Sequence, residues 1–279
     1  MTHKKPTVSI GMPVYNGEKY LRTALDSLLA QTHRHFCLII SDNASTDGTE
    51  AICRAYIERD PRVVYFRQPL NIGAAANFQF TLDQANAEFF MWAAHDDYWA
   101  PRFLEEALKL LEDPAVGFVF PSFRLKSIRY GIFRTIPADV FKCIEAPVRD
   151  HRVLGFCNLH HSSHKCNLVY SVFRRSILKS ALTKQDVSND GLLSMAILDL
   201  ARGRLMQKAL FAKRYEYLWP GFWKKLWVKR AKLDQFAQIR DASFAKAQGL
   251  FPEYAEELEH MRSSYHYNNH NRQYRIIEH

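Results

Sequence analysis

The alternation of short apolar runs with helical segments constrains the fold more than any other feature of the first 125 residues. Each apolar run has the length and residue types of a buried strand, and the segments between the runs have helical spacing. The predicted strands are 7–12, 36–40, 63–66, 89–94 and 116–120, and the predicted helices are 18–31, 47–59, 74–86 and 101–111. This order predicts an α/β fold with a parallel, doubly wound sheet.

Polar residues gather where the predicted strands end. Four clusters lie at such ends, namely residues 13–18, 42–43, 71–77 and 95–97. Doubly wound sheets bind their ligands beyond the carboxyl ends of the strands, so this coincidence favours a ligand site. No glycine-rich dinucleotide fingerprint follows the first strand, and no GxxxxGK[ST] loop occurs. The sequence therefore argues against a Rossmann dehydrogenase and against a P-loop enzyme.

An acidic pair, Asp96 and Asp97, follows the apolar run 89–94. Two neighbouring carboxylates repel each other and need a counter-charge. Mg²⁺ and Mn²⁺ take oxygen ligands and typically bind one or two carboxylates together with substrate phosphates. A solvated turn or a helix N-cap explains an isolated pair of this kind equally well. The other three polar clusters favour the metal site.

Composition narrows the class of partner and the compartment. Lys and Arg number 38 against 29 Asp and Glu, a formal charge of +9, which favours an anionic partner. No apolar signal region opens the sequence, and no apolar stretch approaches the ~20 residues of a membrane-spanning helix. Five cysteines at irregular spacing argue against a disulfide framework. We therefore expect a cytoplasmic protein, with peripheral contact at the inner face of the membrane as a further option.

Four stretches together resemble the family 2 glycosyltransferases of the GT-A fold: 8–17, 40–49, Asn71-Ile72-Gly73 with Asn77, and His95-Asp96-Asp97. The order and spacing of the stretches match as well. The resemblance implies a Rossmann-like, mostly parallel central sheet flanked by helices, with a helical C-terminal extension. It divides the chain into a nucleotide-sugar-binding half (1–125), an acceptor-binding half of the same domain that carries the catalytic base (126–215), and a basic and aromatic extension (216–279).

The resemblance also assigns roles to residues. It places the base and ribose of a nucleotide-diphosphate sugar beside Asp42 and the segment 13–18, and the diphosphate beside Asn71, Gly73 and Asn77. The implied donor-binding residues are Pro13, Tyr15, Asn16, Glu18, Asp42, Asn71, Gly73, Asn77 and Asp96. Asp97 is the expected ligand of Mn²⁺ or Mg²⁺, with Asp96 and His95 as further candidates. The first acid usual in this motif is absent, and imidazole is a poor ligand for Mg²⁺, so a neutral wall is the favoured role of His95.

In the second half, the resemblance points to Asp190 as the catalytic base, within an Asn189-Asp190 pair where the family often has Glu-Asp. A helix N-cap is the alternative role of Asp190. Residues 126–148 lack periodicity and suit an acceptor-binding loop or a solvated surface excursion. Residues 157–166 hold three His and two Cys; their spacing favours a polar loop over a zinc site.

The stretch 202–232 contains ten Lys or Arg and one acid, with interleaved aromatic residues. A lid over diphosphate or an acceptor site is the favoured role, ahead of membrane-surface contact and of nucleic acid, which we do not expect to bind. An amphipathic helix, with its Trp side packed and its Lys side exposed to solvent, would explain this composition as well. The family's Gln-x-x-Arg-Trp motif of processive members is absent, which predicts single sugar additions. The tail after 248 could dock on a second subunit, as in a homo-oligomer.

The predicted activity is inverting, metal-dependent transfer of a sugar, with a UDP-sugar favoured as donor, to a hydroxyl of a glycan or of a lipid-linked acceptor. Two alternatives stay open. A nucleotidyltransferase would share an α/β sheet, although the Gly-rich loop with Arg or Lys that it needs after the first strand is missing. A non-catalytic nucleotide-sugar-binding subunit is suggested by His95 and Asn189, which stand where acids are usual.

Overall fold

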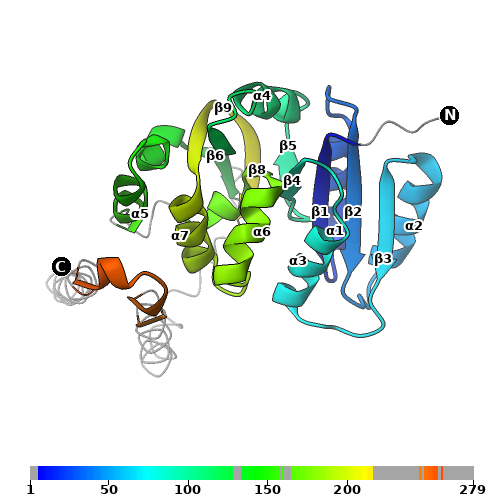
Figure 1. Ribbon diagram of the computed structural model, residues 1–279. Coiled ribbons are helices and arrows are strands. Elements are labelled where there is room, and N and C mark those ends of the chain that lie inside the picture. The colour runs from blue at the N-terminus through cyan, green and yellow to red at the C-terminus, as the bar shows by residue number, and fades with distance from the viewer. Residues whose placement is uncertain are drawn as a thin grey trace, which may run out of the picture.

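The computed structural model describes residues 6–127, 133–157, 159, 165–215, 245–246, 248–256 and 259. Its described part is an α/β structure built on one nine-stranded sheet, whose order is β3-β2-β1-β4-β8-β6-β9-β5, with β7 paired to β6. Figure 1 shows β1, β2 and β3 with α2 at one end of the molecule and α5 with α7 at the other.

The N-terminal half of the sheet is parallel, as predicted. Its elements are β1 (Val8–Val14), α1 (Glu18–Leu29), β2 (Phe36–Asp42), α2 (Thr49–Arg59), β3 (Val63–Arg67), α3 (Ala74–Asp83) and β4 (Phe89–Trp92). In the strand register Val14 pairs with Asp42 and Gly11 with Trp92. The carboxyl ends of β1, β2 and β4 therefore lie at one edge, which brings three of the predicted polar clusters together.

The second half adds antiparallel strands. Its elements are β5 (Tyr98–Trp99), α4 (Phe103–Leu110), β6 (Val116–Ser127), β7 (Phe133–Ile136), η1 (Ala138–Glu145), α5 (Arg149–Cys157), η3 (Lys165–Tyr170), β8 (Val172–Arg174), α6 (Arg175–Lys184), α7 (Asp190–Leu200), β9 (Arg202–Tyr215) and η4 (Pro252–Tyr254). β8 is antiparallel to both β4 and β6, and β9 runs parallel to β6. One sheet thus passes through both predicted halves.

Three segments differ from their sequence predictions. The alternation of apolar residues over 168–173 is typical of a strand, but 3₁₀ helix η3 takes up the first three of them and β8 begins only at Val172. The aperiodic stretch 126–148 contains β7 and η1. The first part of the basic stretch, 202–215, is a long strand rather than a helix. Pairing with distant β6 stabilises this strand, and such a partner leaves no periodic signal in the local sequence.

An aromatic cluster holds the chain directly after the acidic pair. Trp99 of β5 stacks on Phe211 of β9, with ring centroids 5.4 Å apart. Phe103 and Phe123 also pack against Phe211, and all four side chains are buried. Burial of this many aromatic carbons fixes β5 against β9, and so determines where the segment 95–97 lies.

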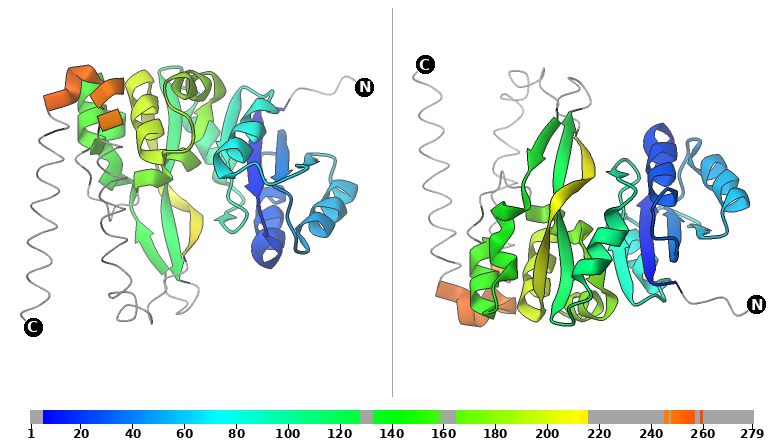
Figure 2. Two further views of the ribbon diagram at one scale, coloured as in Figure 1. Left: turned by 90° about the horizontal axis from the view of Figure 1, so that it is seen from below. Right: turned by 90° about the horizontal axis from the view of Figure 1, so that it is seen from above.

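A described piece of the C-terminal extension packs against α5. Arg149 forms an ion pair with Glu253 at 2.6 Å, and the Tyr254 hydroxyl donates a hydrogen bond to Asp150 at 2.5 Å. This piece, orange in Figure 2, lies beside α5 in both views. Across the described ranges, no helix has the length and apolar character needed to span a membrane. The aromatic part of the basic stretch, 216–232, lies outside the described residues.

Candidate functional site

Three adjoining cavities surround Asp96 at the carboxyl edge of the sheet. The strand-end cavity, of about 340 Å³, is lined by residues from the ends of β1, β2 and β4, from α3 and from η3. The α1 cavity, of about 330 Å³, lies beside the start of α1, and the β9 cavity, of about 290 Å³, lies over β5 and β9. Among the predicted donor residues, Pro13, Tyr15, Asn71, Asn77 and Asp96 line the strand-end cavity, and Asn16 lines the α1 cavity.

Asp97 is buried next to Asp96, and one of its carboxylate oxygens has no hydrogen-bond partner among the described residues. Its side chain is 1% exposed, and its Oδ1 accepts a hydrogen bond from the backbone N–H of Arg214 at 2.9 Å. Among the described residues its Oδ2 has no hydrogen-bond partner, and Lys213 Nζ lies 3.9 Å from it. Burial raises the pKa of Asp97 to about 7, an effect that Lys213 opposes and the Asp96 charge reinforces. A bound cation would satisfy this oxygen.

His95 is held as a neutral side chain between two cavities. Burial lowers its pKa, while the charges of Asp96 and Asp47 act in the opposite direction. Its ring packs on Gly17, where an added Cβ would lie 2.9 Å from the imidazole Cδ2. His95 lines both the strand-end and the α1 cavity. This environment is compatible with the neutral wall expected from the sequence.

Asp190 is the first residue of α7, and it does not cap that helix. Asn189 is the N-cap, and its side-chain oxygen accepts a hydrogen bond from the N–H of Leu192 at 3.0 Å. The Asn in the Asn189-Asp190 pair therefore performs the capping that was the alternative role of Asp190. The Asp190 side chain is open to solvent on one side. Desolvation by the surrounding protein raises its pKa, and Lys213 opposes the shift.

Tyr170 and Lys213 connect the acidic pair with Asp190. The Lys213 ammonium lies 4.2 Å from the centre of the Tyr170 ring, and its charge favours the ionised forms of both Asp97 and Asp190. Burial raises the pKa of Tyr170, and the charges of Asp97, Asp190 and Asp96 raise it further. Tyr170 and Asp96 line the strand-end cavity, whereas Asp97 and Asp190 do not. Neither Tyr170 nor Lys213 was singled out from the sequence.

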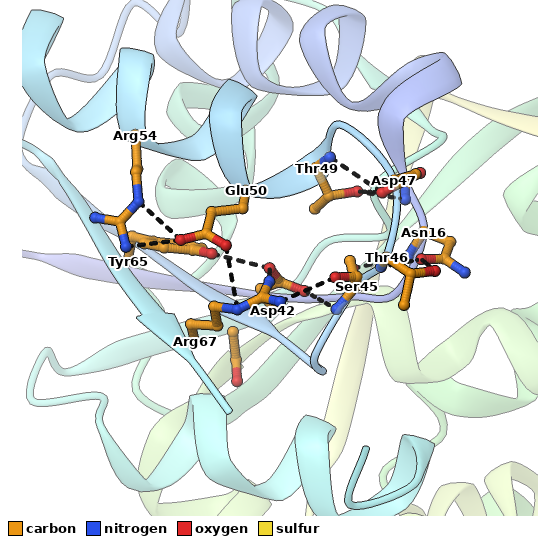
Figure 3. Close-up of polar contacts among 12 residues, drawn as sticks. Asn16, Asp42, Ser45, Thr46, Asp47, Thr49, Glu50, Arg54, Tyr65 and Arg67 are labelled. Carbon is orange, nitrogen blue, oxygen red and sulfur yellow. Dashed lines mark hydrogen bonds and ion pairs between the residues drawn. The ribbon is translucent and has the colours of Figure 1, made fainter. Parts of the chain in front are cut away.

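Asp42 is enclosed by its own chain (Figure 3). Its side chain is fully buried and accepts hydrogen bonds from Ser45 N at 2.9 Å, from Tyr65 Oη at 2.8 Å and from Arg67 at 2.8 Å. Glu50 extends this network by pairing with Arg67 at 3.2 Å. Asp42 lines none of the three cavities around Asp96. A nucleotide base can therefore contact the Asp42 carboxylate only if the side chain of Arg67 or Tyr65 moves away from it.

Two other predicted donor residues tie loops together. Asn16, at a φ of 51°, receives a hydrogen bond from Thr46 N at 2.9 Å, and its own N–H donates to Ser45 Oγ at 2.9 Å. Figure 3 shows Asn16 beside Thr46 and Ser45. Glu18 accepts a hydrogen bond from Gly48 N at 3.0 Å. These contacts fix the segment 13–18 against the loop that follows β2.

The loop before α3 is anchored in a similar way. Asn43 donates to the side-chain oxygen of Asn71 at 2.9 Å and accepts from Ile72 N at 2.8 Å. Gly73, at a φ of 83°, precedes the first residue of α3, in a conformation that a residue with a Cβ rarely adopts. Asn77 is buried at 2% exposure, accepts from Ser41 Oγ at 2.6 Å and donates to the Ser41 carbonyl at 2.9 Å. Asn77 therefore joins α3 to β2 as well as facing the cavity.

Asn77→Ala is expected to lower the free energy of unfolding by about 1–3 kcal/mol, because the buried Ser41 hydroxyl and carbonyl both lose a partner. Urea unfolding measures the change. Gln79→Ala, on the same helix with a surface contact to Asp83, is the control and should change stability by less than about 0.5 kcal/mol. Equal stability of the two variants would show that the Ser41 pair does not anchor α3.

The residues around Asp96 fit a hard divalent cation that is completed by a ligand. In the described part of the chain, no group of three or more His, Cys, Asp or Glu residues is arranged to hold a metal ion alone. Asp96 on the cavity wall and Oδ2 of Asp97 would supply one or two carboxylate oxygens to such an ion, as Mg²⁺ sites do when substrate phosphates provide the rest. Of the cysteine- and histidine-rich loop, His160, His161 and His164 lie outside the described residues.

Known proteins resemble this chain in sequence. Over 127 residues it is 35% identical to the putative teichuronic acid biosynthesis glycosyltransferase TuaG of Bacillus subtilis. The matched segment covers 45% of this chain and 50% of TuaG. Over 106 residues it is 36% identical to the uncharacterized glycosyltransferase RT0329 of Rickettsia typhi. That match covers 38% of this chain and 32% of RT0329. The chain thus spans half or less of the length of these relatives.

Solved structures resemble it in fold. TarS 1–349 of S. aureus, in complex with UDP, matches with a TM-score of 0.59 at 22% identity, over 75% of this chain and 60% of TarS. The mannosyltransferase PcManGT of Pyrobaculum calidifontis, in complex with GDP-Man and Mn²⁺, matches with a TM-score of 0.59 at 20% identity, over 93% of this chain and 70% of PcManGT. These matches confirm the predicted GT-A fold.

The family model described as glycosyl transferase family 2 matches residues 9–181. The match begins in β1 and ends in α6, so it contains the strand ends, the acidic pair and Tyr170, and stops before Asp190. Because it spans more than half of the chain, this chain belongs to glycosyl transferase family 2.

Proposed function

We propose that the protein transfers a sugar from a nucleoside diphosphate to an acceptor hydroxyl, with inversion at the anomeric carbon. The observation that carries this proposal is the strand-end cavity, which Asp96 and Tyr170 line. Lys213 Nζ lies 4.2 Å from the centre of the Tyr170 ring and 3.9 Å from Asp97 Oδ2, and the charge of Asp190 also acts on Tyr170. Transfer of this kind needs negative charge to be stabilised on one side of the reacting carbon and a proton to be removed on the other. The two sets of carboxylates suit these two tasks.

The donor occupies the strand-end cavity in this proposal. Its base and ribose lie toward Pro13 and Tyr15, and its diphosphate toward Asn71 and the start of α3, where backbone N–H groups favour an anion. Asp97 and Asp96 are the residues that hold Mn²⁺ or Mg²⁺, and the bound ion would neutralise charge on the departing diphosphate. Arg67 and Tyr65 swing away from Asp42 when the base binds, which frees that carboxylate for a hydrogen bond.

Asp190 acts as the general base. Its carboxylate accepts the proton of the acceptor hydroxyl while the hydroxyl oxygen attacks the anomeric carbon in one displacement. A general base works best when its pKa lies near the operating pH, so the raised pKa of Asp190 supports this role. The positive charge of Lys213 favours the ionised forms of both Asp190 and Asp97.

The nature of the substrates is inferred from what similar proteins bind. TarS is known in complex with UDP and with UDP-GlcNAc, and PcManGT with GDP-Man and Mn²⁺. We take a UDP-sugar as the donor and a glycan or lipid-linked sugar as the acceptor, with one sugar added per encounter. The name of TuaG, which refers to teichuronic acid biosynthesis, is in keeping with a role in polysaccharide assembly.

Ligand-dependent melting of the full chain tests this proposal. Nucleoside diphosphates and their sugars are added one by one with Mn²⁺, and each melting temperature is compared with that of the free protein. A ligand at 100 times its dissociation constant adds about 2.7 kcal/mol, which for a chain of this size raises the melting temperature by about 5 °C. We expect UDP-sugars to give such a shift and EDTA to remove it. No shift with any nucleotide in the presence of Mn²⁺ would contradict the proposal.

A further inference from the structure

The β9 cavity lies over β5 and β9, and Asp96 is the one residue of the proposed reaction among its described lining residues. Its floor is a row of residues on three neighbouring strands, because Tyr98 of β5 and Arg124 of β6 both pair with Ala212 of β9. Small residues, Ala100 and Ala209 among them, leave about 290 Å³ above this row. A volume at the low end of ligand pockets suits a single sugar unit.

Two guanidinium groups border this cavity. Arg124 is exposed, and its side chain takes part in no hydrogen bond or ion pair within the part of the chain that the structure describes. Arg214 is oriented by a hydrogen bond from its Nε to the Asp96 carbonyl at 2.9 Å and by the Tyr20 ring, 4.2 Å away. The two terminal nitrogens of Arg214 have no partner among the described residues. Among the described lining residues Asp96 is the one acid, against Arg124 and Arg214, so this lining is net cationic.

The walls also offer an apolar surface. The Tyr98 side chain is 42% exposed and borders the cavity together with the alanines of the floor. A flat aromatic ring can pack against the C–H groups of a sugar, while guanidinium groups bind carboxylate or phosphate through paired hydrogen bonds. Charge and shape together select a ligand that is both a saccharide and an anion.

The position of the cavity separates it from the reacting groups. Successive side chains of a strand point to opposite faces. Lys213 faces Tyr170 and Asp97, so its neighbours Ala212 and Arg214 face the other way, toward the β9 cavity. Asp96 lines both this cavity and the strand-end cavity. Asp190 does not line the β9 cavity, whereas the proposed donor site adjoins it at Asp96.

We propose that the β9 cavity is a subsite for an anionic saccharide unit of the acceptor, bound by Arg124 and Arg214 and packed on Tyr98. This inference rests on the proposed transferase function, since it takes the ligand to be part of the acceptor chain. The anionic group is a carboxylate, as in a uronic acid, or a phosphate, as in a polyol phosphate. The subsite anchors a unit remote from the hydroxyl that reacts.

Calorimetric titration of the full chain tests the subsite with three probes: an oligogalacturonate, a glycerol phosphate oligomer and a neutral maltooligosaccharide. We expect one charged probe to bind and the neutral probe to bind much more weakly. Arg124→Ala should lower the affinity for the charged probe by about 10- to 100-fold. The charged probe that binds the wild type and loses affinity in Arg124→Ala shows whether the anionic group is a carboxylate or a phosphate. Arg59→Ala, which removes an exposed arginine from distant α2, is the matched control and should leave this affinity unchanged.

Two further readouts separate this inference from the proposed function. UDP-sugar binding with Mn²⁺ should be equal in wild type and Arg124→Ala, and with an anionic acceptor the variant should raise KM while kcat stays the same. Loss of nucleotide binding in the wild type itself would overturn the proposed function. Normal nucleotide binding combined with equal affinity for charged and neutral probes, or with no effect of Arg124→Ala, would overturn the subsite alone.

Discussion

Asp190→Asn is expected to lower the rate of sugar transfer by about 10²- to 10⁴-fold, the usual contribution of a general base. Asparagine retains the shape of the side chain and its place at the start of α7, but it cannot accept the acceptor proton. Donor affinity should change by less than about twofold, because Asp190 lines none of the three cavities around Asp96. Transfer is measured at saturating donor, and donor affinity by calorimetry with Mn²⁺.

Asp186→Asn is the matched control for this experiment. Asp186 lies four residues earlier, is exposed, and accepts hydrogen bonds from Ser188, an interaction that an asparagine oxygen can keep. Before an acceptor is identified, slow hydrolysis of the donor gives the same comparison, since water is then the attacking hydroxyl. A fully active Asp190→Asn protein, or an equal loss in both variants, would rule out Asp190 as the base.

Asp97→Asn is expected to remove a large pH dependence from the stability of the metal-free protein. The pKa of Asp97 is about 7 in the folded chain and about 3.9 in an unfolded chain. Between these values the folded state binds a proton that the unfolded state does not, so stability falls as pH rises from about 4 to about 7. The full effect is about 4 kcal/mol, and the asparagine variant lacks it.

Urea unfolding in EDTA, repeated at several pH values from 5 to 8, measures this difference between wild type and variant. Glu58→Gln, at an exposed position of α2, is the control and should keep the wild-type slope. With Mn²⁺ and a UDP-sugar present, Asp97→Asn should lose the stabilisation that the wild type gains, because the neutral amide is a weaker metal ligand. Parallel pH profiles of wild type and Asp97→Asn would contradict the buried, proton-binding state of Asp97.

The sequence predicted the parts of this molecule that depend on local pattern. Period and residue type located β1 to β4 with their helices, and the parallel sheet then brought the polar clusters to one edge. Asp96 and Asn71 lie on the wall of one cavity for this reason. Asn189 and Asp190 at the start of α7 also follow from local signals, namely a capping residue before an apolar helix.

The missed features depend on distant partners. Strand β9 is held by β6, and its residues carry the basic composition of a surface segment, so no alternation revealed it. Lys213 and Tyr170 meet only because β9 and η3 pack at the same place. The expected base contact, Asp42, is enclosed by Tyr65 and Arg67, a pairing between strands that spacing along the chain cannot reveal.

The stereochemistry of the product tests the central claim most directly, since it reports whether a single displacement takes place between the Asp96–Asp97 pair and Asp190. The wild-type protein is given a UDP-sugar of α configuration, Mn²⁺ and its acceptor, and the first product is examined by proton NMR before any equilibration. An acceptor activated by Asp190 on the face opposite to the departing diphosphate yields a β linkage, which is the result we predict. An α linkage would contradict the account, because retention requires a mechanism that these carboxylates do not provide.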